Sequence, residues 1–421
     1  MNMTRTSEIR SFVLVVAICF FCACSGSDQQ DLPSGGVVGG EDDALVLALA
    51  VLSENEDGSP KLLPARLGIL TRQGDEWTHR VLEDPDSNVF HKAMVYRNRD
   101  GAEGILTLGG MNAVLKIWKT DGTSDTLWEA DFGGAFSRMR DAEVGDIYGD
   151  GSSAIVVATH DQGVVAVVRP DGSGGFSIDE LDREPNTVVH EIELGDLDGD
   201  GLLEIYATVT ALNAVDGTPQ PGKVLRYTPA VGEGRVEVVD LGLRHAKEIL
   251  VDDVDGDGRD ELYVSVEAVS GGRVEIHRYD AGPQSVKPNV VATLDDQLCR
   301  FLTTGDVDGD GVLELVAATY KAGLWLLLPG EDAWTTELID AESSGFEHAA
   351  ILLDLDQDGR DELYVASDDQ GQVRSYVWTD HGWHRNIILE YSDKLSRFTW
   401  SIMPVPSTLL PVSNPAFVME K

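Results

Sequence analysis

The sequence predicts an all-β fold, a seven-bladed β-propeller built from four-stranded antiparallel blades. Three observations carry this prediction: an acidic loop that recurs about every 50 residues, a strand-forming run directly after each loop, and chain ends that are complementary fragments of one repeat. Four short strands in a period of this length are typical of a propeller blade. A β-solenoid, the weaker alternative, would have shorter turns and fewer strands per period.

The acidic loop occurs in four full copies, each with carboxylates at positions 1, 3, 5 and 9 and a glycine at position 6. Hard cations such as Ca²⁺ take oxygen ligands from short loops of this kind, and the glycine allows the sharp turn. We therefore predict about four bound calcium ions. The predicted ligands are Asp196, Asp198, Asp200, Glu204, Asp253, Asp255, Asp257, Glu261, Asp306, Asp308, Asp310, Glu314, Asp354, Asp356, Asp358 and Glu362.

An EF-hand shares the first nine positions of this loop, but it requires a Glu at position 12 and a helix after the loop. Position 12 is Ala207, Val264, Ala317 or Val365 in the four copies. The residues that follow each loop, such as Glu261–Val266, are β-branched and aromatic and therefore favour a strand. The remaining alternative is a set of acidic surface turns without a ligand, but such turns would hardly retain four carboxylates each.

Two degenerate copies precede the full loops and bring the number of loop-bearing repeats to six. The copy at residues 146–154 keeps only Asp146 and Asp150, so it is a candidate for a fifth, weakly held ion. The copy that begins at Tyr96 has lost most of its acidic residues, and we expect it to hold no ion.

Each repeat contains four candidate strands bounded by Gly, Pro or Asp. In the fourth blade they are Lys247–Asp253, Glu261–Val266, Gly272–Tyr279 and Pro288–Leu294. Tryptophans open the last strand of three blades, at Trp77, Trp334 and Trp383. Their recurrence at one structural position indicates packing within the propeller rather than a surface for carbohydrate stacking.

The two ends of the chain together supply a seventh blade. The segment before the first loop has three candidate strands, Leu45–Leu52, Arg66–Thr71 and Trp77–Leu82, with no inner strand ahead of them. The last repeat stops after Ser396–Met403, which resembles the inner strand that begins at Cys299. We therefore expect the C-terminal inner strand to pair with the N-terminal strands, because this pairing closes the ring and removes exposed sheet edges.

The loops and their spacing resemble the FG-GAP/VCBS repeat family, the calcium-bearing propellers that include the heads of integrin α-chains. The resemblance rests on the four full loops, weakly on the two degenerate ones, and extends over residues 44–404. It implies a propeller and bound calcium. It does not imply one function, because the family includes adhesion heads, secreted scaffolds and a few carbohydrate-active enzymes.

The N-terminus is predicted to direct export. Arg5 and Arg10 precede an apolar run that is too short to span a bilayer, as in a signal peptide over residues 1–23. The ending Phe21-Cys22-Ala23-Cys24 resembles a bacterial lipobox, which makes Cys24 the predicted lipidation site. The chain is therefore expected to be an exported bacterial lipoprotein at the outer membrane or cell surface; cleavage without lipidation is the alternative.

The other domain boundaries follow from composition. Residues 24–43 are polar and glycine-rich and are predicted to form a flexible tether. The propeller is expected over residues 44–404, with a C-terminal tail at 405–421. If Cys24 carries lipid, Cys299 has no partner for a disulfide within the mature chain.

The net charge of −41, from 73 acidic and 32 basic residues, restricts the partners. An acidic surface repels nucleic acid and anionic lipid, so neither is expected to bind. Contact with a membrane is expected only through the lipid anchor, and the expected state is a monomer.

A basic ring is the second candidate site. Six residues before the first position of successive loops stand Arg140, His190, Lys247, Arg300 and His348, with Arg397 as the equivalent in the closing strand. These residues begin the inner strands, so they should surround the central channel at the mouth opposite the calcium loops. The ring could bind an anionic group. Alternatively, neighbouring acids such as Asp141, Glu191 and Glu248 could neutralise it.

Two functions remain open. The first is a calcium-stabilised binding or scaffold module that recognises a protein or glycan through the face opposite the calcium loops. Two long loops on that face, Ser53–Pro64 and Leu212–Gly222, are the best partner-binding candidates. The alternative is a polysaccharide lyase, with His190 or His348 as the base and Arg140 or Arg300 holding a uronate carboxylate. A non-enzymatic role is the main expectation, because none of the familiar catalytic motifs occurs.

Overall fold

The computed structural model describes residues 43–418 except for positions 75, 99–100, 111–112, 134–136, 212–213, 215, 269–270, 281–287, 331–332 and 413–416. The predicted signal peptide, Cys24 and nearly all of the predicted tether lie outside the described residues. Within the described part of the chain, no helix has the length and hydropathy needed to cross a membrane.

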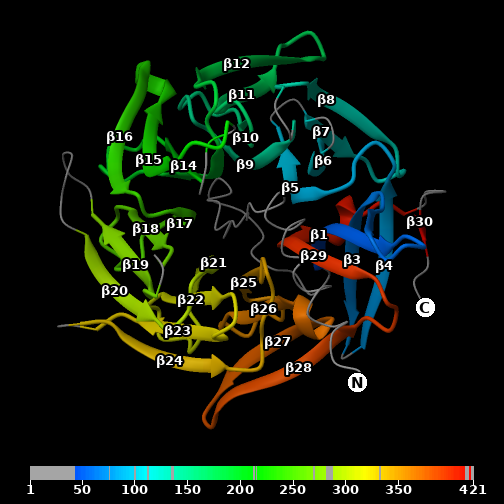
Figure 1. The fold of residues 1–421 in the computed structure, drawn as a ribbon, viewed down its shortest axis with the longest axis vertical. Helices are drawn as coiled ribbons and strands as arrows, with labels where there is room; N and C mark the ends of the chain where they lie inside the picture. Colours follow the sequence, from blue (N-terminus) through cyan, green and yellow to red (C-terminus); the bar gives the residue numbers. More distant parts are fainter. Residues whose placement is uncertain are drawn as a thin grey trace.

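The described strands form seven antiparallel sheets that surround a central axis (Figure 1). This arrangement confirms the predicted propeller. Six sheets are consecutive four-stranded blades, numbered here in chain order. The first three blades are β5 (Phe90–Arg97), β6 (Glu103–Gly109), β7 (Ala113–Trp118) and β8 (Ser124–Ala130); β9 (Met139–Gly145), β10 (Ala154–Thr159), β11 (Val164–Pro170) and β12 (Phe176–Arg183); and β13 (Val189–Gly195), β14 (Glu204–Ala211), β15 (Gln220–Thr228) and β16 (Glu233–Gly242). The next three blades are β17 (Ala246–Asp252), β18 (Glu261–Val266), β19 (Val274–Tyr279) and β20 (Asn289–Leu294); β21 (Cys299–Gly305), β22 (Glu314–Thr319), β23 (Leu324–Leu328) and β24 (Thr335–Asp340); and β25 (Ala350–Leu353), β26 (Glu362–Ser367), β27 (Gln372–Thr379) and β28 (Gly382–Glu390). Three short 3₁₀ turns, η1 (Pro229–Val231), η2 (Asp368–Gln370) and η3 (Ser407–Leu409), complete the described elements.

The seventh blade combines the two ends of the chain, as predicted. Its inner strand is β29 (Ser396–Pro406), which pairs with β1 (Asp43–Glu54), and β3 (Ala65–Gln73) and β4 (Glu76–Asp84) follow outward. Figure 1 shows the first and last strands of the ring, β1 in blue and β29 in red, side by side. Two short strands extend this sheet: β2 (Pro60–Leu62) beside β1, and β30 (Phe417–Val418) beside β4.

The closing blade continues past residue 404, where the sequence analysis placed the end of the propeller. Strand β29 runs to Pro406, and Leu409 and Leu410 are buried. The outermost pairing, between β30 and β4, lies later still in the chain. The C-terminal segment therefore takes part in the strand pairing that closes the ring.

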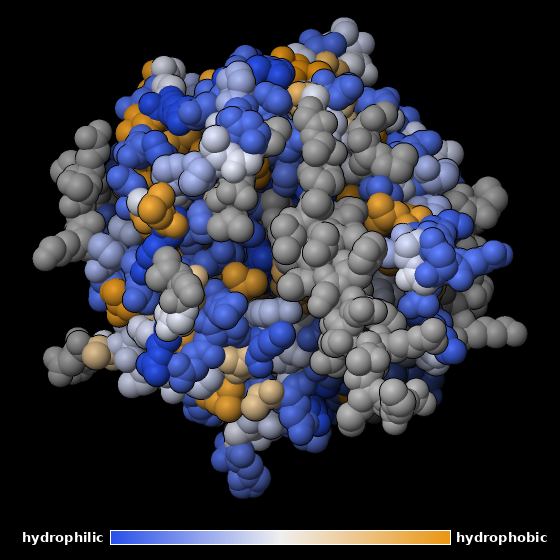
Figure 2. Space-filling view, viewed as in Figure 1, coloured by the Kyte–Doolittle hydropathy of each residue, from blue (hydrophilic) through white to orange (hydrophobic). Residues whose placement is uncertain are grey.

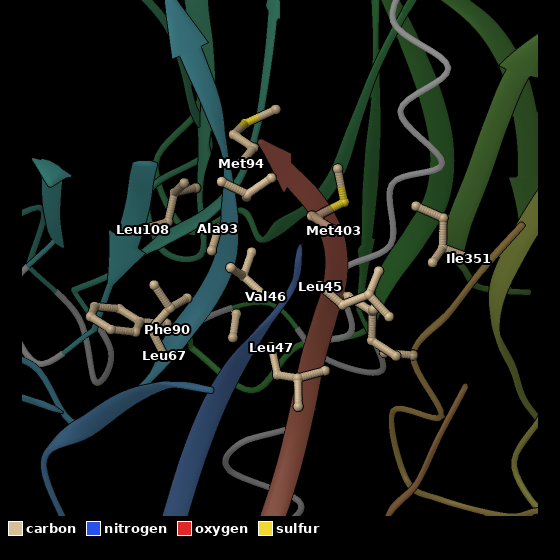
Figure 3. Packing of buried hydrophobic residues seen from close by; sticks show 14 of the residues in the cluster. Leu45, Val46, Leu47, Leu67, Phe90, Ala93, Met94, Leu108, Ile351 and Met403 are labelled. Carbon is tan, nitrogen blue, oxygen red and sulfur yellow. The ribbon is translucent and has the colours of Figure 1, made fainter. Parts of the chain in front are cut away.

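Burial explains the composition of the strands. The second strand of a blade, for example β18 or β26, is buried at every position, and its residues are mainly β-branched, aromatic or leucine. The outer strands, such as β12 and β24, are mostly exposed. The largest core cluster joins the closing blade to its neighbours, with Leu45, Val46 and Leu47 of β1 among residues of β5 and β6 (Figure 3).

Aromatic side chains at the start of outer strands pack against the preceding blade. Trp77 of β4 meets Tyr364 of β26 with ring centroids 6.2 Å apart. Trp334, just before β24, lies 6.1 Å from Tyr263 of β18 in the same way. These contacts agree with the packing role that the recurrence of tryptophan predicts. On the face shown in Figure 2, the coloured surface is largely hydrophilic, in keeping with the charge of −41.

Candidate metal loops and an axial polar site

Each full acidic loop follows an inner strand and has the same internal hydrogen bonds. In the loop that begins at Asp354, its Oδ1 accepts from the N–H of Asp358 at 3.0 Å and its Oδ2 from the N–H of Gly359 at 2.9 Å. The Asp358 carboxylate in turn accepts from the N–H of Arg360 at 3.0 Å. Gly359 has φ of +88°, a conformation that favours glycine. These bonds fix the carboxylates of the loop in a converging arrangement.

The predicted aspartate ligands come together in all four loops, and the position-9 glutamate joins them in two. One oxygen from each member lies within 4.8 Å of those of the others in the following sets: Asp253, Asp255, Asp257 and Glu261; Asp354, Asp356, Asp358 and Glu362; Asp196, Asp198 and Asp200; Asp306, Asp308 and Asp310. Two position-9 residues, Glu204 and Glu314, lie outside these sets. Each still accepts a hydrogen bond from the backbone of its own loop, at 3.3 and 3.1 Å.

The position-9 glutamates are buried behind their loops, each no more than 4% exposed. Burial, reinforced by the charges of the loop aspartates, raises the pKa of Glu261, Glu314 and Glu362 to about 7. A bound cation would favour the ionised carboxylate and would release a proton on binding near neutral pH. The donor set consists of carboxylate oxygens, which suits a hard divalent cation rather than a soft metal. These acidic loops could therefore bind metal ions.

Neighbouring loops are joined in pairs by an Arg-Asp sequence at positions 7 and 8. The Oδ2 of Asp260 accepts from the N–H of Asp196 at 2.6 Å, and Asp361 does the same for Asp306 at 2.7 Å. The Arg259 side chain also covers Gly199, where an added Cβ would lie 3.0 Å from the guanidinium Nε. Each loop that carries this sequence thus supports the loop of the preceding blade.

The degenerate loop at residues 146–154 keeps only part of the pattern of the full loops. Asp146 keeps the hydrogen bonds to Asp150 and Gly151 at 3.0 and 2.6 Å. Position 3, however, is Tyr148, and the Arg169 guanidinium lies over its ring at 4.5 Å beside a pocket of about 320 Å³. A cationic side chain at this loop disfavours a fifth ion.

The basic ring is produced by β-bulges. In the first five blades the register of the inner strand shifts at its first residues, and the unpaired residue in each shift is a ring residue. Bulges re-aim side chains and are frequent beside functional sites. The bulged residues are His91, Arg140, His190 with Glu191, Lys247 and Arg300.

Two ring positions differ from the sequence analysis. The first blade contributes His91, which the loop spacing did not identify because the loop after β5 is one residue shorter: Tyr96 pairs with Gly104 where Gly145 pairs with Ala154. In the closing blade the bulged residue is Trp400, not Arg397. That strand has no loop after it from which to count, so the sequence alignment selected a residue three positions too early.

The match to known sequences falls on the acidic loops. A family model described as an FG-GAP-like repeat matches residues 253–317, which contain the loops beginning at Asp253 and Asp306. This match and the seven blades together support an FG-GAP repeat propeller. Among curated proteins, none matches it at a significant level.

Solved structures share the architecture of this FG-GAP repeat propeller. Two examples, from Bacteroides fragilis and Bacteroides uniformis, are each provisionally named a 6-phosphogluconolactonase. They are 15% and 13% identical to this chain, cover 86% of it in both cases and 98% and 100% of their own lengths, and have TM-scores of 0.50. Similarity at this level of identity concerns the fold alone.

The FG-GAP propeller brings part of the predicted ring together at its axis. Burial lowers the pKa of His190 well below its usual value, and the charges of Lys247, Arg140 and Arg300 lower it further. The His190 imidazole is therefore neutral at physiological pH, among cations. The Arg140 guanidinium lies 5.0 Å from the Trp400 ring centroid, and the His91 ring lies 4.6 Å from it.

The other two predicted ring residues have local partners. His348 donates from Nδ1 to the Thr319 carbonyl oxygen at 2.6 Å, so its neutral ring accepts at Nε2 from the Ser343 hydroxyl at 2.7 Å. Arg397 forms an ion pair with Asp393 and lies over the Tyr391 ring at 3.8 Å. Neither side chain is positioned as a base or an anion clamp at the axis.

Two of the acidic residues that could neutralise the ring, Asp141 and Glu248, also contact residues outside the ring. Asp141 contacts Lys92 at 3.3 Å and accepts from the N–H of Ile192 at 2.9 Å, while Glu248 accepts from the N–H of Leu302 at 2.7 Å. These acids join neighbouring blades.

Of the two predicted long loops, Ser53–Pro64 contains β2, which pairs with β1. The second loop, Leu212–Gly222, includes residues outside the described ones.

A second layer of axial residues was missed at the sequence level. These residues lie six positions after position 9 of each loop, where the second strand ends beside the start of the inner strand: Gly110, His160, Thr210, Glu267, Tyr320 and Asp368. Aligning the repeats at this position, where four of six residues are ionisable or aromatic, could have revealed them.

Proposed function

We propose that this protein is a calcium-stabilised binding or scaffold module that recognises an anionic group on a protein or glycan. Recognition uses the propeller face at which the inner strands begin. The observation that carries the proposal is the series of bulges, which directs Arg140, Lys247 and Arg300 toward one mouth of the axis while the metal loops occupy the other. Binding residues on a rigid scaffold with distant structural metals suit this role.

Calcium is the proposed occupant of the four full loops. The sets of three or four convergent carboxylates support it, since Ca²⁺ accepts six to eight oxygen ligands in flexible geometry. Its proposed role is to hold each hairpin at the end of an inner strand, so that the blades keep their register. The ion takes no part in recognition in this proposal.

An array of acidic and neutral glycans, probed with calcium-loaded protein, tests the recognition face. We expect binding to acidic members, and the double variant Tyr320→Ala with Phe346→Ala should lose it, because both half-buried rings lie at the axial mouth. The matched control is Arg385→Gln on the outer strand β28, which should bind normally. Binding that survives the double variant but fails with Arg385→Gln would contradict the proposal.

Attachment to the cell surface through a lipid on Cys24 is part of the proposal. The lipobox-like sequence at residues 21–24 supports it. Fractionation of cells that express Cys24→Ser should move the protein from the membrane fraction to the soluble exported fraction. An unchanged distribution would count against the anchor.

A polysaccharide lyase is the second candidate function. The neutral, buried imidazole of His190 beside Arg140 and Lys247 favours it, because proton abstraction next to a uronate needs a base and a carboxylate partner. A screen of acidic polysaccharides for unsaturated products distinguishes the two. Product formation that His190→Ala abolishes would favour the lyase over the binding module.

A further inference from the structure

Three aromatic rings from neighbouring blades meet at the axial mouth. The Phe346 ring lies 5.9 Å from Tyr320 and 6.1 Å from Phe398, both in edge-to-face geometry. All three are half-buried, and Lys321 is exposed beside them with its ammonium 4.4 Å from the Tyr320 ring. We call Tyr320, Phe346 and Phe398 the axial aromatic cluster. It offers apolar ring surface next to a positive charge.

Two charged side chains beside this cluster lack hydrogen-bond partners. Arg300 is 1% exposed, and neither its Nε nor its Nη1 has a partner. Its guanidinium lies 4.7 Å from the Phe346 ring, and the nearest carboxylate, of Glu267, is 3.9 Å from Nη1. Glu347 is fully buried, and neither of its carboxylate oxygens has a partner.

Burying Arg300 and Glu347 without hydrogen-bond partners costs free energy unless a ligand supplies those partners. A buried polar group without a hydrogen bond lowers stability, and the loss is larger when the group is charged. Direct pairing would remove this cost, yet the described residues show no ion pair between Arg300 and Glu347. The arrangement therefore suits a ligand that accepts from the guanidinium and donates to the carboxylate.

We propose that this corner of the axis binds a uronic acid residue. The sugar carboxylate would accept from Nε and Nη1 of Arg300 in the bidentate geometry that guanidinium favours. Its hydroxyls would donate to Glu347, and the face of the sugar ring would lie on Phe346. The proposal rests on the recognition face proposed above and adds the ligand class and the residues that select it.

The combination excludes simpler ligands. A bare anion would satisfy Arg300 but leave the carboxyl group of Glu347 unpaired. A neutral sugar would satisfy Glu347 but leave the buried guanidinium without an acceptor. Sites that require both groups discriminate strongly, because an incomplete ligand leaves buried polar atoms unpaired. A carboxylate and several hydroxyls on one small ring meet both requirements.

Calorimetric titration of the calcium-loaded full-length chain tests the proposal, with glucuronate and galacturonate against glucose, galactose and acetate at constant ionic strength. We expect at least one uronate to bind about tenfold or more tightly than its neutral sugar and than acetate. Arg300→Gln should lower uronate affinity by about tenfold or more, and Glu347→Gln should reduce the preference for uronate over acetate. Arg244→Gln, which removes a half-exposed arginine paired with Glu275, is the matched control and should leave the affinity unchanged.

Folding of each variant is checked by its melting temperature. If Arg300→Gln does not fold, Phe346→Leu provides a second route, since it removes the ring surface and keeps both charged groups. Equal affinity for acetate and uronate, or no uronate binding up to about 10 mM, would overturn the inference. In that event, acidic-glycan binding that the axial double variant abolishes would still leave the proposed function standing.

Discussion

Chelation of calcium is expected to lower the free energy of unfolding of the propeller by about 6 kcal/mol. A free ion concentration about tenfold above Kd adds about 1.4 kcal/mol per site, and the four full loops would act together. The effect should be large because the carboxylates of each loop repel one another once the ion has left. The measurement is a denaturant or thermal melt in calcium and in excess EGTA, with an expected fall in Tm of about 10 °C.

Replacement of the position-3 aspartates separates the ion from the loop itself. These residues, Asp198, Asp255, Asp308 and Asp356, belong to the metal sets but make few of the hydrogen bonds that shape the loops. The combined Asp→Asn variant should melt near the temperature of the chelated protein and show no further shift with EGTA. A wild-type shift near zero would refute calcium stabilisation.

The contributions of the loops should differ. The sets at Asp253 and Asp354 contain all four carboxylates, whereas Glu204 lies outside its set and contacts Arg226 at 3.1 Å. Arg278 contacts Glu261 at 3.2 Å in a similar way, but Glu261 stays within its set. We therefore expect the loop at Asp196 to be the weakest of the four. Calcium in its neighbour at Asp253 should still support it through Asp260.

The overall fold could be predicted from sequence because the repeat carries its own register. Each loop marks the end of an inner strand, so the strands of a blade such as Glu261–Val266 could be placed within a residue or two. Closure of the ring could be predicted because the two ends of the chain are incomplete in complementary ways. The strand at Ser396 is an inner strand without the rest of its blade, and the strands from Leu45 onward lack an inner strand. These inferences need only local pattern and the requirement that sheet edges be paired.

The axial site could be predicted only in part. Sequence spacing assigned Arg140, Lys247 and Arg300 to the start of their strands, but a bulge depends on how two strands pair, which spacing does not reveal. His348 was placed in the ring although its hydrogen bonds to Thr319 and Ser343 belong to the local backbone and loop. Side-chain partners of this kind depend on rotamers and on neighbouring blades.

Loss of the buried ammonium of Lys92 is expected to have the second-largest effect. Lys92 is fully buried, forms an ion pair with Glu143 and lies 3.3 Å from Asp141, which in turn holds the backbone of the next blade. Lys92→Met would leave two carboxylates buried without their cation. Breaking a buried pair from one side costs about 3–5 kcal/mol. The measurement is the free energy of unfolding from urea melts at pH 7.

Acid should reduce this deficit. Burial raises the pKa of Asp141, and Lys92 opposes that rise, so removing Lys92 raises the pKa further. A raised carboxyl pKa contributes stability at low pH that is lost as the pH rises through the folded-state value. The difference between Lys92→Met and the wild type should therefore shrink as the pH falls below 7, because the folded variant takes up a proton at Asp141.

Two further variants separate lost charge from lost packing. Adding Asp141→Asn and Glu143→Gln to Lys92→Met should recover part of the stability at pH 7, since neutral side chains no longer need a cation and Asn can still accept from Ile192. Lys119→Met, which removes an exposed ammonium 2.7 Å from Asp125, should leave the urea midpoint unchanged. If Lys92→Met were no more destabilising than Lys119→Met, or if its deficit did not depend on pH, the buried ion pair would not be what joins these blades.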